Sequence, residues 1–324
     1  MSNHNGLVYA YVLDGSGGGR PMTWMDIRDW KPQDGMLWMH IDYTVPEARA
    51  WLEDKSGLNS LTCDTLMEDG TRPRNVTSDE GLLLILRGVN CNPGEDPDDM
   101  VALRMFFTEH RLITMRQRPI MALTDINGYI ESGNGPVSAG DFLVMIAERI
   151  ADRMGDVISD IDDKVDEIED SILTGETDQL RPQLAGIRRQ TIRLRRYIAP
   201  QRDVLLRLLH DRVTWLAESE RTRLREVAER TARFVEDVDS ARDRAAITQE
   251  EINNRLSEQM NKAMYLLSIV AAIFLPLGLL TGLLGINVGG IPGSENSLAF
   301  TFVTIGLVMI ALLLILWFKR IKWL

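Results

Sequence analysis

Two long apolar segments near the C-terminal end constrain the fold of this 324-residue chain more than any other feature. They extend over residues 264–285 and 298–318, and neither contains an acidic or basic residue. About 20 apolar residues in an α-helix, at a rise of about 1.5 Å per residue, cross a hydrocarbon layer roughly 30 Å thick. A buried helix of a soluble protein explains such a tandem pair poorly. We therefore predict transmembrane helices over 263–285 and 298–318, joined by a short external loop at 286–297.

Basic residues flank this pair of segments and are missing from the loop between them. Arg255 and Lys262 precede the first segment, and Lys319, Arg320 and Lys322 follow the second. Because basic residues concentrate on the cytoplasmic side, both termini are expected in the cytoplasm. The N-terminus has no secretory signal pattern, which agrees with this orientation. The basic tail at 319–324 is expected to anchor to anionic headgroups, and in a symmetric oligomer it would also form a basic ring.

Residues 1–135 have the mixed pattern of an α/β domain. Segments rich in β-branched and aromatic residues, bounded by Gly, Pro, Asn or Asp, predict strands at 7–14, 36–42, 82–90, 100–107 and 111–116. One helix is predicted after Thr44, which has capping-box spacing to Glu47, and another over 59–69. The glycine-rich run at 15–19 lacks the Lys-Ser/Thr ending of a phosphate-binding loop, so we interpret it as a turn.

From about Pro136 the pattern becomes helical. Apolar residues recur every three or four positions over 142–172, which predicts a long helix ending near Gly175. A second helix is predicted over 178–212, and a third begins near Ser219, with Glu218 or Ser219 as its N-cap. No Gly or Pro occurs from there to residue 274. The third helix is therefore expected to continue through the first membrane segment, over roughly 100 Å.

The predicted architecture is an α+β membrane protein. It has a cytoplasmic α/β domain at 1–135 and a cytoplasmic helical stalk at 136–262, whose last helix runs into the first membrane segment. The stalk's last helix has apolar or small residues in alternating steps of three and four over 224–245, as in a coiled-coil seam. A helix of this length needs partners along its seam, so we expect a homo-oligomer.

Composition argues against several classes of function. A net charge of −11 disfavours a general nucleic-acid binder. Cys63 and Cys91 lie far apart in a cytoplasmic region, so no disulfide is expected. No combination of nucleophile, base and orienting group stands out, so we predict neither an enzyme nor a bound cofactor. The four histidines lack the spacing of metal ligands and lie outside the membrane segments; they are His4, His40, His110 and His210.

A dense acidic run at 160–170 has two interpretations. It concentrates cations near a cytoplasmic entrance, or it is simply a solvated helix face, which is the reading we favour. The arginines at 188–196 are expected to pair with this run across a helical hairpin or a subunit boundary.

One face of the first membrane segment is small or weakly polar. Small residues allow close helix packing in lipid, and around a central axis the same face would line a pore. Pro276 is expected to free a carbonyl group and kink the helix. The predicted pore-lining residues are Asn261, Met264, Leu267, Ser268, Ala271, Leu275, Gly278 and Gly282.

The triplet Gly285-Ile286-Asn287 follows directly after this segment. Together with TRPR at 71–74, APQRDVL at 199–205 and KWL at 322–324, it resembles the CorA family of divalent cation transporters over essentially the whole chain. The LLGINVGGIPG stretch is similar to the zinc-transporter (ZntB) branch. The resemblance implies a homopentameric funnel in a bacterial inner membrane. It also implies that Gly285, Ile286 and Asn287 form a ring at the outer mouth, where Asn287 meets the cation through its hydration shell.

Two departures from the magnesium-specialised pattern favour Zn²⁺ as the transported ion. Ile286 stands where those members have Met, and Glu295 is the only acidic residue of the outer loop. The predicted pore face has no thiolate or imidazole, the ligands that Zn²⁺ prefers, so zinc rests on the resemblance. A Mg²⁺, Co²⁺ or Ni²⁺ channel of the same family is the alternative, and a non-conducting membrane-anchored sensor or scaffold is a third reading. The resemblance also implies coupling to protons, although neither membrane segment contains a carboxylate or histidine to relay them.

Overall fold

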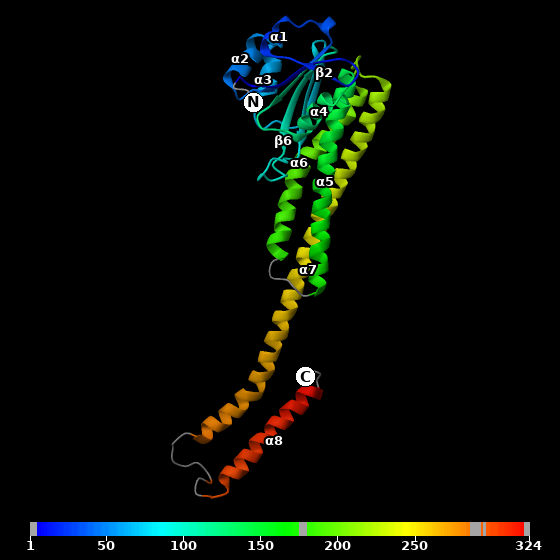
Figure 1. Ribbon diagram of the computed structural model, residues 1–324. Helices are drawn as coiled ribbons and strands as arrows, with labels where there is room; N and C mark the ends of the chain where they lie inside the picture. The colour runs from blue at the N-terminus through cyan, green and yellow to red at the C-terminus, as the bar shows by residue number, and fades with distance from the viewer. Residues whose placement is uncertain (1–4, 175–179, 286–292, 294–295, 321–324) are drawn as a thin grey trace. The chain divides into compact units, whose positions relative to one another are not determined.

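The computed structural model describes residues 5–174, 180–285, 293 and 296–320 (Figure 1). The chain divides into two units, residues 1–249 and 250–324. The first unit contains a β-sheet, the helices packed on it and the N-terminal part of α7 (Glu218–Gly285). The second contains the rest of α7 and α8 (Ala299–Arg320). The division therefore falls inside α7. This helix is continuous, as the lack of Gly and Pro between residues 219 and 274 predicts.

A seven-stranded sheet forms the centre of the first unit. Its order is β2-β1-β3-β7-β6-β5-β4, and all neighbouring strands are antiparallel except β3 and β7, which are parallel. Each strand expected from the sequence is present, whereas β2 and β4 were not expected because they are short and mostly exposed. The strands are β1 (Leu7–Leu13), β2 (Gly19–Pro21), β3 (Met36–Asp42), β4 (Arg74–Ser78), β5 (Gly81–Gly88), β6 (Val101–Phe107) and β7 (Arg111–Arg116).

Helices cover both faces of this sheet (Figure 1). On one face lie α1 (Trp24–Asp29), α2 (Pro46–Asp54) and α3 (Ser60–Met67), over a core that includes Met39 and Ile41 of β3. The opposite face carries α4 (Met121–Glu131), α5 (Ala139–Thr174) and α6 (Leu180–His210). There Trp38 of β3 packs on Phe142 of α5, with 5.0 Å between the ring centroids. Neighbouring residues of β3 thus enter opposite layers, as the alternation of a strand requires.

The start of α2 differs from the sequence prediction. The helix begins at Pro46, and its N-cap is Val45 without a side-chain hydrogen bond, so the predicted capping box of Thr44 and Glu47 is wrong. Thr44 instead donates from its backbone N–H and its hydroxyl to Asp42 Oδ1, at 3.1 and 2.6 Å. Proline decides the start because its fixed φ and missing N–H suit the first helical position.

The N-cap predicted for α7 is also wrong. Since α7 begins at Glu218, the residue before the helix is Ala217, and neither Glu218 nor Ser219 lies in the cap position. The backbone N–H of Ala217 donates to Glu220 Oε2 at 2.7 Å. An acid inside the first turn therefore binds the free N–H at the helix start, and this arrangement also suits the helix dipole.

The run at 15–19 is a turn between β1 and β2, as predicted. The Asp14 carboxylate accepts hydrogen bonds from the backbone of Ser16 and Gly18 at 2.8 and 3.0 Å. Gly17 has a φ of 101°, a conformation that glycine adopts without a steric penalty.

The apolar seam of α7 is buried within the single chain. Leu224, Val227 and Val238 are at most 3% exposed. The Phe234 ring lies against Gly155 of α5, so closely that a Cβ there would come within 3.2 Å of it. This seam is filled by the chain's own helices and does not by itself require a second chain.

Candidate functional site

The C-terminal part of α7 and the whole of α8 expose many large apolar side chains. Leu267, Leu275 and Phe300 are 70%, 72% and 82% exposed. Each helix contains an apolar window of 18 residues. Only 6% of this window is buried in α7 and 0% in α8, whereas the core helix of a soluble protein is mostly buried. The 22 residues of α8 extend about 33 Å, close to the thickness of a hydrocarbon layer. Both helices are long and apolar enough to cross a membrane.

The predicted pore-lining residues all lie in α7 and share one side of it. Their steps of three and four residues bring them to one face of a helix. Each is exposed in the single chain except Ala271, which is half-buried. The chain itself therefore leaves this face open. The residues are Asn261, Met264, Leu267, Ser268, Ala271, Leu275, Gly278 and Gly282.

Glycines occupy the C-terminal part of this face. A Cβ added to Gly278, Gly282 or Gly285 would meet nothing within 4 Å in the single chain. Glycine inside a helix costs about 0.5–1 kcal/mol relative to alanine. Packing within the single chain therefore does not require glycine at these three positions.

The polar groups of this region are uncharged. Ser268 Oγ donates to the carbonyl of Met264 at 2.8 Å, and Thr281 Oγ1 donates to that of Leu277 at 3.0 Å. Helix α7 continues through Pro276, which has no N–H to offer the carbonyl of Ala272. The kink expected at Pro276 stays a prediction. Hydroxyl and carbonyl oxygens suit a cation that keeps its water shell better than one that is tightly ligated.

Several predicted site residues fall outside the described residues: Ile286, Asn287, Glu295 and Lys322. Gly285 is the last residue of α7, so the Gly-Ile-Asn triplet begins where the helix ends. Lys319 and Arg320 are exposed in the last turn of α8.

Among the described residues, no group of three or more His, Cys, Asp or Glu side chains is placed to hold a metal ion. His40 is buried, and its Nδ1 lies 2.9 Å from Thr114 Oγ1. Burial, followed by the charge of Arg116, lowers the pKa of His40 to about 3. Cys63 is buried as well, its Sγ donates to the carbonyl of Leu52 at 3.4 Å, and burial raises the pKa of its thiol. Both side chains serve packing.

The acidic run of α5 pairs with a different helix from the one expected. Arg244 of α7 binds Glu169 of α5 at 2.7 Å and also binds Asp166. On α6, Arg195 binds Asp239 of α7 at 2.5 Å, and Arg193 binds Asp98 at 3.0 Å. Within the chain, the predicted pairing across the α5–α6 hairpin is therefore wrong for these arginines, because α7 presents its basic residues to the acidic face of α5. The alternative, a pairing across a subunit boundary, stays a prediction.

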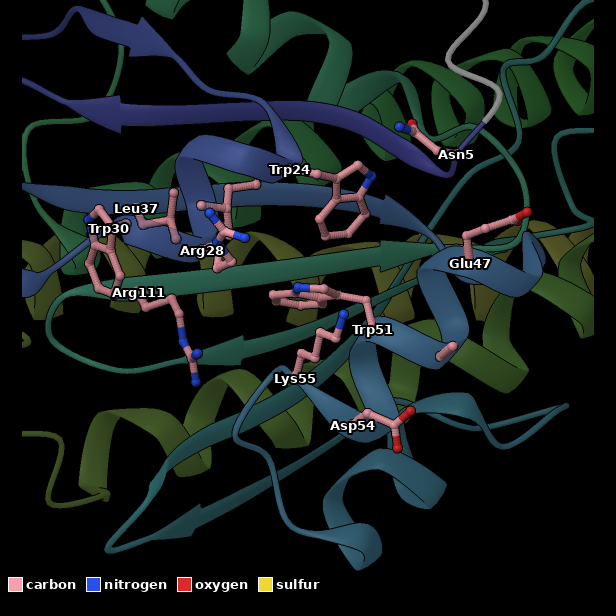
Figure 2. Close-up of a pocket in the computed structure, with 12 residues that line it drawn as sticks. Asn5, Trp24, Arg28, Trp30, Leu37, Glu47, Trp51, Asp54, Lys55 and Arg111 are labelled. Atoms are coloured by element: carbon pink, nitrogen blue, oxygen red, sulfur yellow. The ribbon is translucent and has the colours of Figure 1, made fainter.

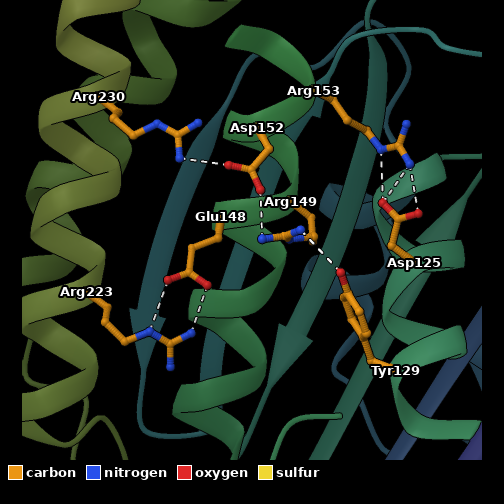
Figure 3. A network of polar contacts seen from close by, with 8 residues as sticks. All are labelled: Asp125, Tyr129, Glu148, Arg149, Asp152, Arg153, Arg223 and Arg230. Carbon is orange, nitrogen blue, oxygen red and sulfur yellow. Dashed lines mark hydrogen bonds and ion pairs between the residues drawn. The ribbon is translucent and has the colours of Figure 1, made fainter. Parts of the chain in front are cut away.

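A series of ion pairs fastens α7 to α5 (Figure 3). Arg223 binds both oxygens of Glu148 at 3.0 and 2.8 Å, and Arg230 binds Asp152 at 2.8 Å. The hydrogen bond to Glu148 is the largest cause of a raised pKa of Arg223. Arg223, Arg230 and Arg244 are separated by multiples of seven residues, so they lie along one face of α7. This heptad spacing of the three arginines is present in the sequence and is the signal that indicates the set.

One position of this series carries the opposite charge. Asp237 lies seven residues after Arg230 and faces Asp162 of α5. Burial of Asp162, and then the charge of Asp237, raise the pKa of the Asp162 carboxyl. The same helix α5 also holds α4, through two hydrogen bonds from Arg153 Nη2 to the Asp125 carboxylate at 2.8 and 2.7 Å (Figure 3).

Comparisons with known proteins give matches that cover nearly the whole chain and that indicate the same family. A family model described as "CorA-like Mg²⁺ transporter protein" matches residues 33–320. The chain is 40% identical to the divalent cation transporter CmaX of Pseudomonas aeruginosa, over 99% of this chain and 98% of the relative. It is 37% identical to the zinc transport protein ZntB of Yersinia pseudotuberculosis, over 98% and 96% of the two chains. A solved structure of full-length CmaX superposes with a TM-score of 0.87 at 40% identity and covers 100% of both chains.

Proposed function

The chain belongs to the CorA-like Mg²⁺ transporter family, and from this premise we propose that it moves divalent cations across a membrane, with Zn²⁺ as the transported ion. Support for zinc comes from the relative named a zinc transport protein and from Ile286 in the triplet. Transport of Mg²⁺, Co²⁺ or Ni²⁺ is the alternative, since the CmaX relative is named only a divalent cation transporter.

The observation that carries the proposed path is the open, weakly polar face of α7. A single helix encloses no path, so several copies must surround an axis with this face turned inward. Small residues at Ala271, Gly278 and Gly282 would keep the axis wide enough for a hydrated ion. We take the assembly to be a homopentamer in a bacterial inner membrane, with both termini in the cytoplasm.

A ring at the outer end of α7 would select the ion. Each Gly285 would contribute a carbonyl oxygen and each Asn287 a side-chain amide, which contacts the ion through its water shell. Oxygen dipoles without a full charge bind an ion weakly enough to release it again. Glu295 in the outer loop would attract cations toward this ring.

Zinc uptake by liposomes that contain the purified protein tests the proposal. We expect a zinc-sensitive dye inside the vesicles to respond faster than in protein-free vesicles, and addition of Mg²⁺, Co²⁺ or Ni²⁺ to compete weakly. Repeating the assay with and without a proton gradient tests coupling to protons. Absence of flux above empty vesicles at every gradient would falsify the proposed function, and stronger transport of Mg²⁺ would favour the alternative ion.

The Asn287→Ala variant tests the outer ring. It removes the amide but leaves the helix, so we expect a loss of at least about tenfold in zinc flux, as for a lost hydrogen-bonding group at a charged ligand. Ser297→Ala changes a side chain of the same loop outside the triplet and should transport normally. Normal flux through Asn287→Ala would show that the ring lies elsewhere.

The mass of the protein in detergent tests the assembly. We expect a particle of five times the 36.6 kDa of one chain. A monomer would contradict a path enclosed by several copies of α7.

A further inference from the structure

The first unit has an open pocket on the sheet face covered by α1 and α2. Its volume is about 880 Å³, within the range of pockets that bind small molecules. Three tryptophans line it, and two of them, Trp24 and Trp51, pack with ring centroids 5.0 Å apart. Figure 2 shows these two indoles in the middle of the pocket and Trp30 at one side.

Cationic side chains lie next to the tryptophans. Arg28, Lys55 and Arg111 line the pocket; Arg28 and Arg111 lie to one side of the Trp24–Trp51 pair, and Lys55 is beside Trp51 (Figure 2). Across the ranges that the structure describes, no carboxylate pairs with Lys55 or Arg111. Among the described residues, the carboxylate that pairs with Arg28 is the exposed Asp29 beside it in the chain, at 3.3 Å.

Arg111 is the most constrained of the three cations. Its Nη1 donates to the carbonyl of Ser56 at 2.6 Å, and burial alone lowers the pKa of its guanidinium. A half-buried cation without an acid is unfavourable unless an anion supplies the missing charge. The pocket's own acids, Glu47 and Asp54, lie away from Arg111, toward the α2 side (Figure 2).

We propose that this pocket binds a nucleotide. The two indole planes are tilted by 47°, so the base would stack on the face of one of them, because indole faces attract flat aromatic rings. The phosphate would contact Arg28, Lys55 and Arg111, since guanidinium and ammonium groups are the side chains that best bind phosphate. Glu47 would disfavour a phosphate at the opposite end and accept a hydrogen bond from an amino group of the base, which fixes the direction of the ligand.

Isothermal titration of the full-length protein in detergent with AMP tests the proposal. We expect one AMP per chain, with binding of adenosine and of ribose 5-phosphate each at least about tenfold weaker, because each lacks one of the two recognised parts. Equal binding of AMP and adenosine would overturn the phosphate contacts, and equal binding of AMP and ribose 5-phosphate would overturn the stacking. Absence of AMP binding would overturn the whole proposal.

Variants locate the binding on this pocket. Lys55→Gln and Arg28→Gln change exposed side chains, so the fold should persist while AMP binds about tenfold more weakly. Lys31→Gln removes a nearby exposed cation that does not line the pocket and should bind AMP normally. Trp51→Phe keeps a ring in the core and should weaken AMP more than ribose 5-phosphate. Unchanged AMP affinity in both Lys55→Gln and Arg28→Gln would overturn the assignment.

Discussion

At the scale of single residues, Gly282 gives the sharpest test of the proposed path. Nothing in its own chain lies within 4 Å of a Cβ placed there. A leucine would therefore fit the isolated chain and even favour the helix, by about 0.5–1 kcal/mol. If copies of α7 surround an axis at this position, five leucines would fill it. We expect Gly282→Leu to abolish zinc flux in liposomes, although the protein still inserts.

Gly306 of α8 provides a matched control. It too is a helical glycine with no neighbour within 4 Å of an added Cβ, but it lies outside the predicted pore face. Gly306→Leu should keep most of the flux. Similar flux in the two variants would mean that the axis is not lined by Gly282.

At the scale of elements, the ion pairs between α5 and α7 decide how firmly α7 is held in the first unit. Arg223 contacts Glu148 and also Asp141, at 2.6 Å, and its side chain is 40% exposed. Allowing for this exposure, we expect Arg223→Ala to cost about 1 kcal/mol. That loss lowers the Tm of the full-length protein in detergent by about 2 °C, measured by circular dichroism.

Arg242→Ala is the matched control for this variant. Arg242 pairs with Asp239 and Asp243 of its own helix, so its loss breaks no connection between helices. Its Tm should stay within about 1 °C of the parent, as is usual for exposed pairs. Equal losses for the two arginines would argue against a fastening role of the contact with α5.

At the scale of the whole molecule, the two units differ in the surface they expose. Residues 1–249 contain the sheet and its two buried layers, whereas the exposed apolar side chains of the second unit include Leu275 and Phe300. We expect a fragment of residues 1–249 to be soluble without detergent and to unfold cooperatively, and the full chain to need detergent. Analytical ultracentrifugation and thermal unfolding measure both properties. An aggregated, non-cooperative fragment would show that the first unit depends on the second.

Much of the fold could be predicted because its signals are local. Buried strands such as β3 and β7 carry apolar runs, and the stripe of α5 repeats at helical spacing, so the sequence indicates both type and position. Strands β2 and β4 and helix α1 carry no such signal, because they are short and form only against the elements beside them in the fold. The predicted N-caps of α2 and α7 were wrong for a related reason. Several residues near a helix start compete for the cap position, and small differences in geometry decide among them.

The two candidate sites also differ in how far the sequence reveals them. The uncharged face of α7 and the triplet at its end are visible in the sequence, because they lie within one helix and the residues that follow it. The pocket of Trp24, Trp51 and Arg111 is not, since its residues come from α1, α2 and β7 and meet only when the sheet forms.

The sequence by itself determined that the C-terminal helices belong in an apolar phase. The free energy of transferring about 20 apolar residues from water is a sum of contributions from consecutive residues. It can therefore be judged without knowing the fold. Only the tertiary structure decided that, within the chain, acids of α5 such as Glu148 and Glu169 pair with arginines of α7 and not with the arginines at 188–196 of α6. Charges act on whatever lies nearest in space, and an ion pair forms only when packing has brought both groups within a few ångströms.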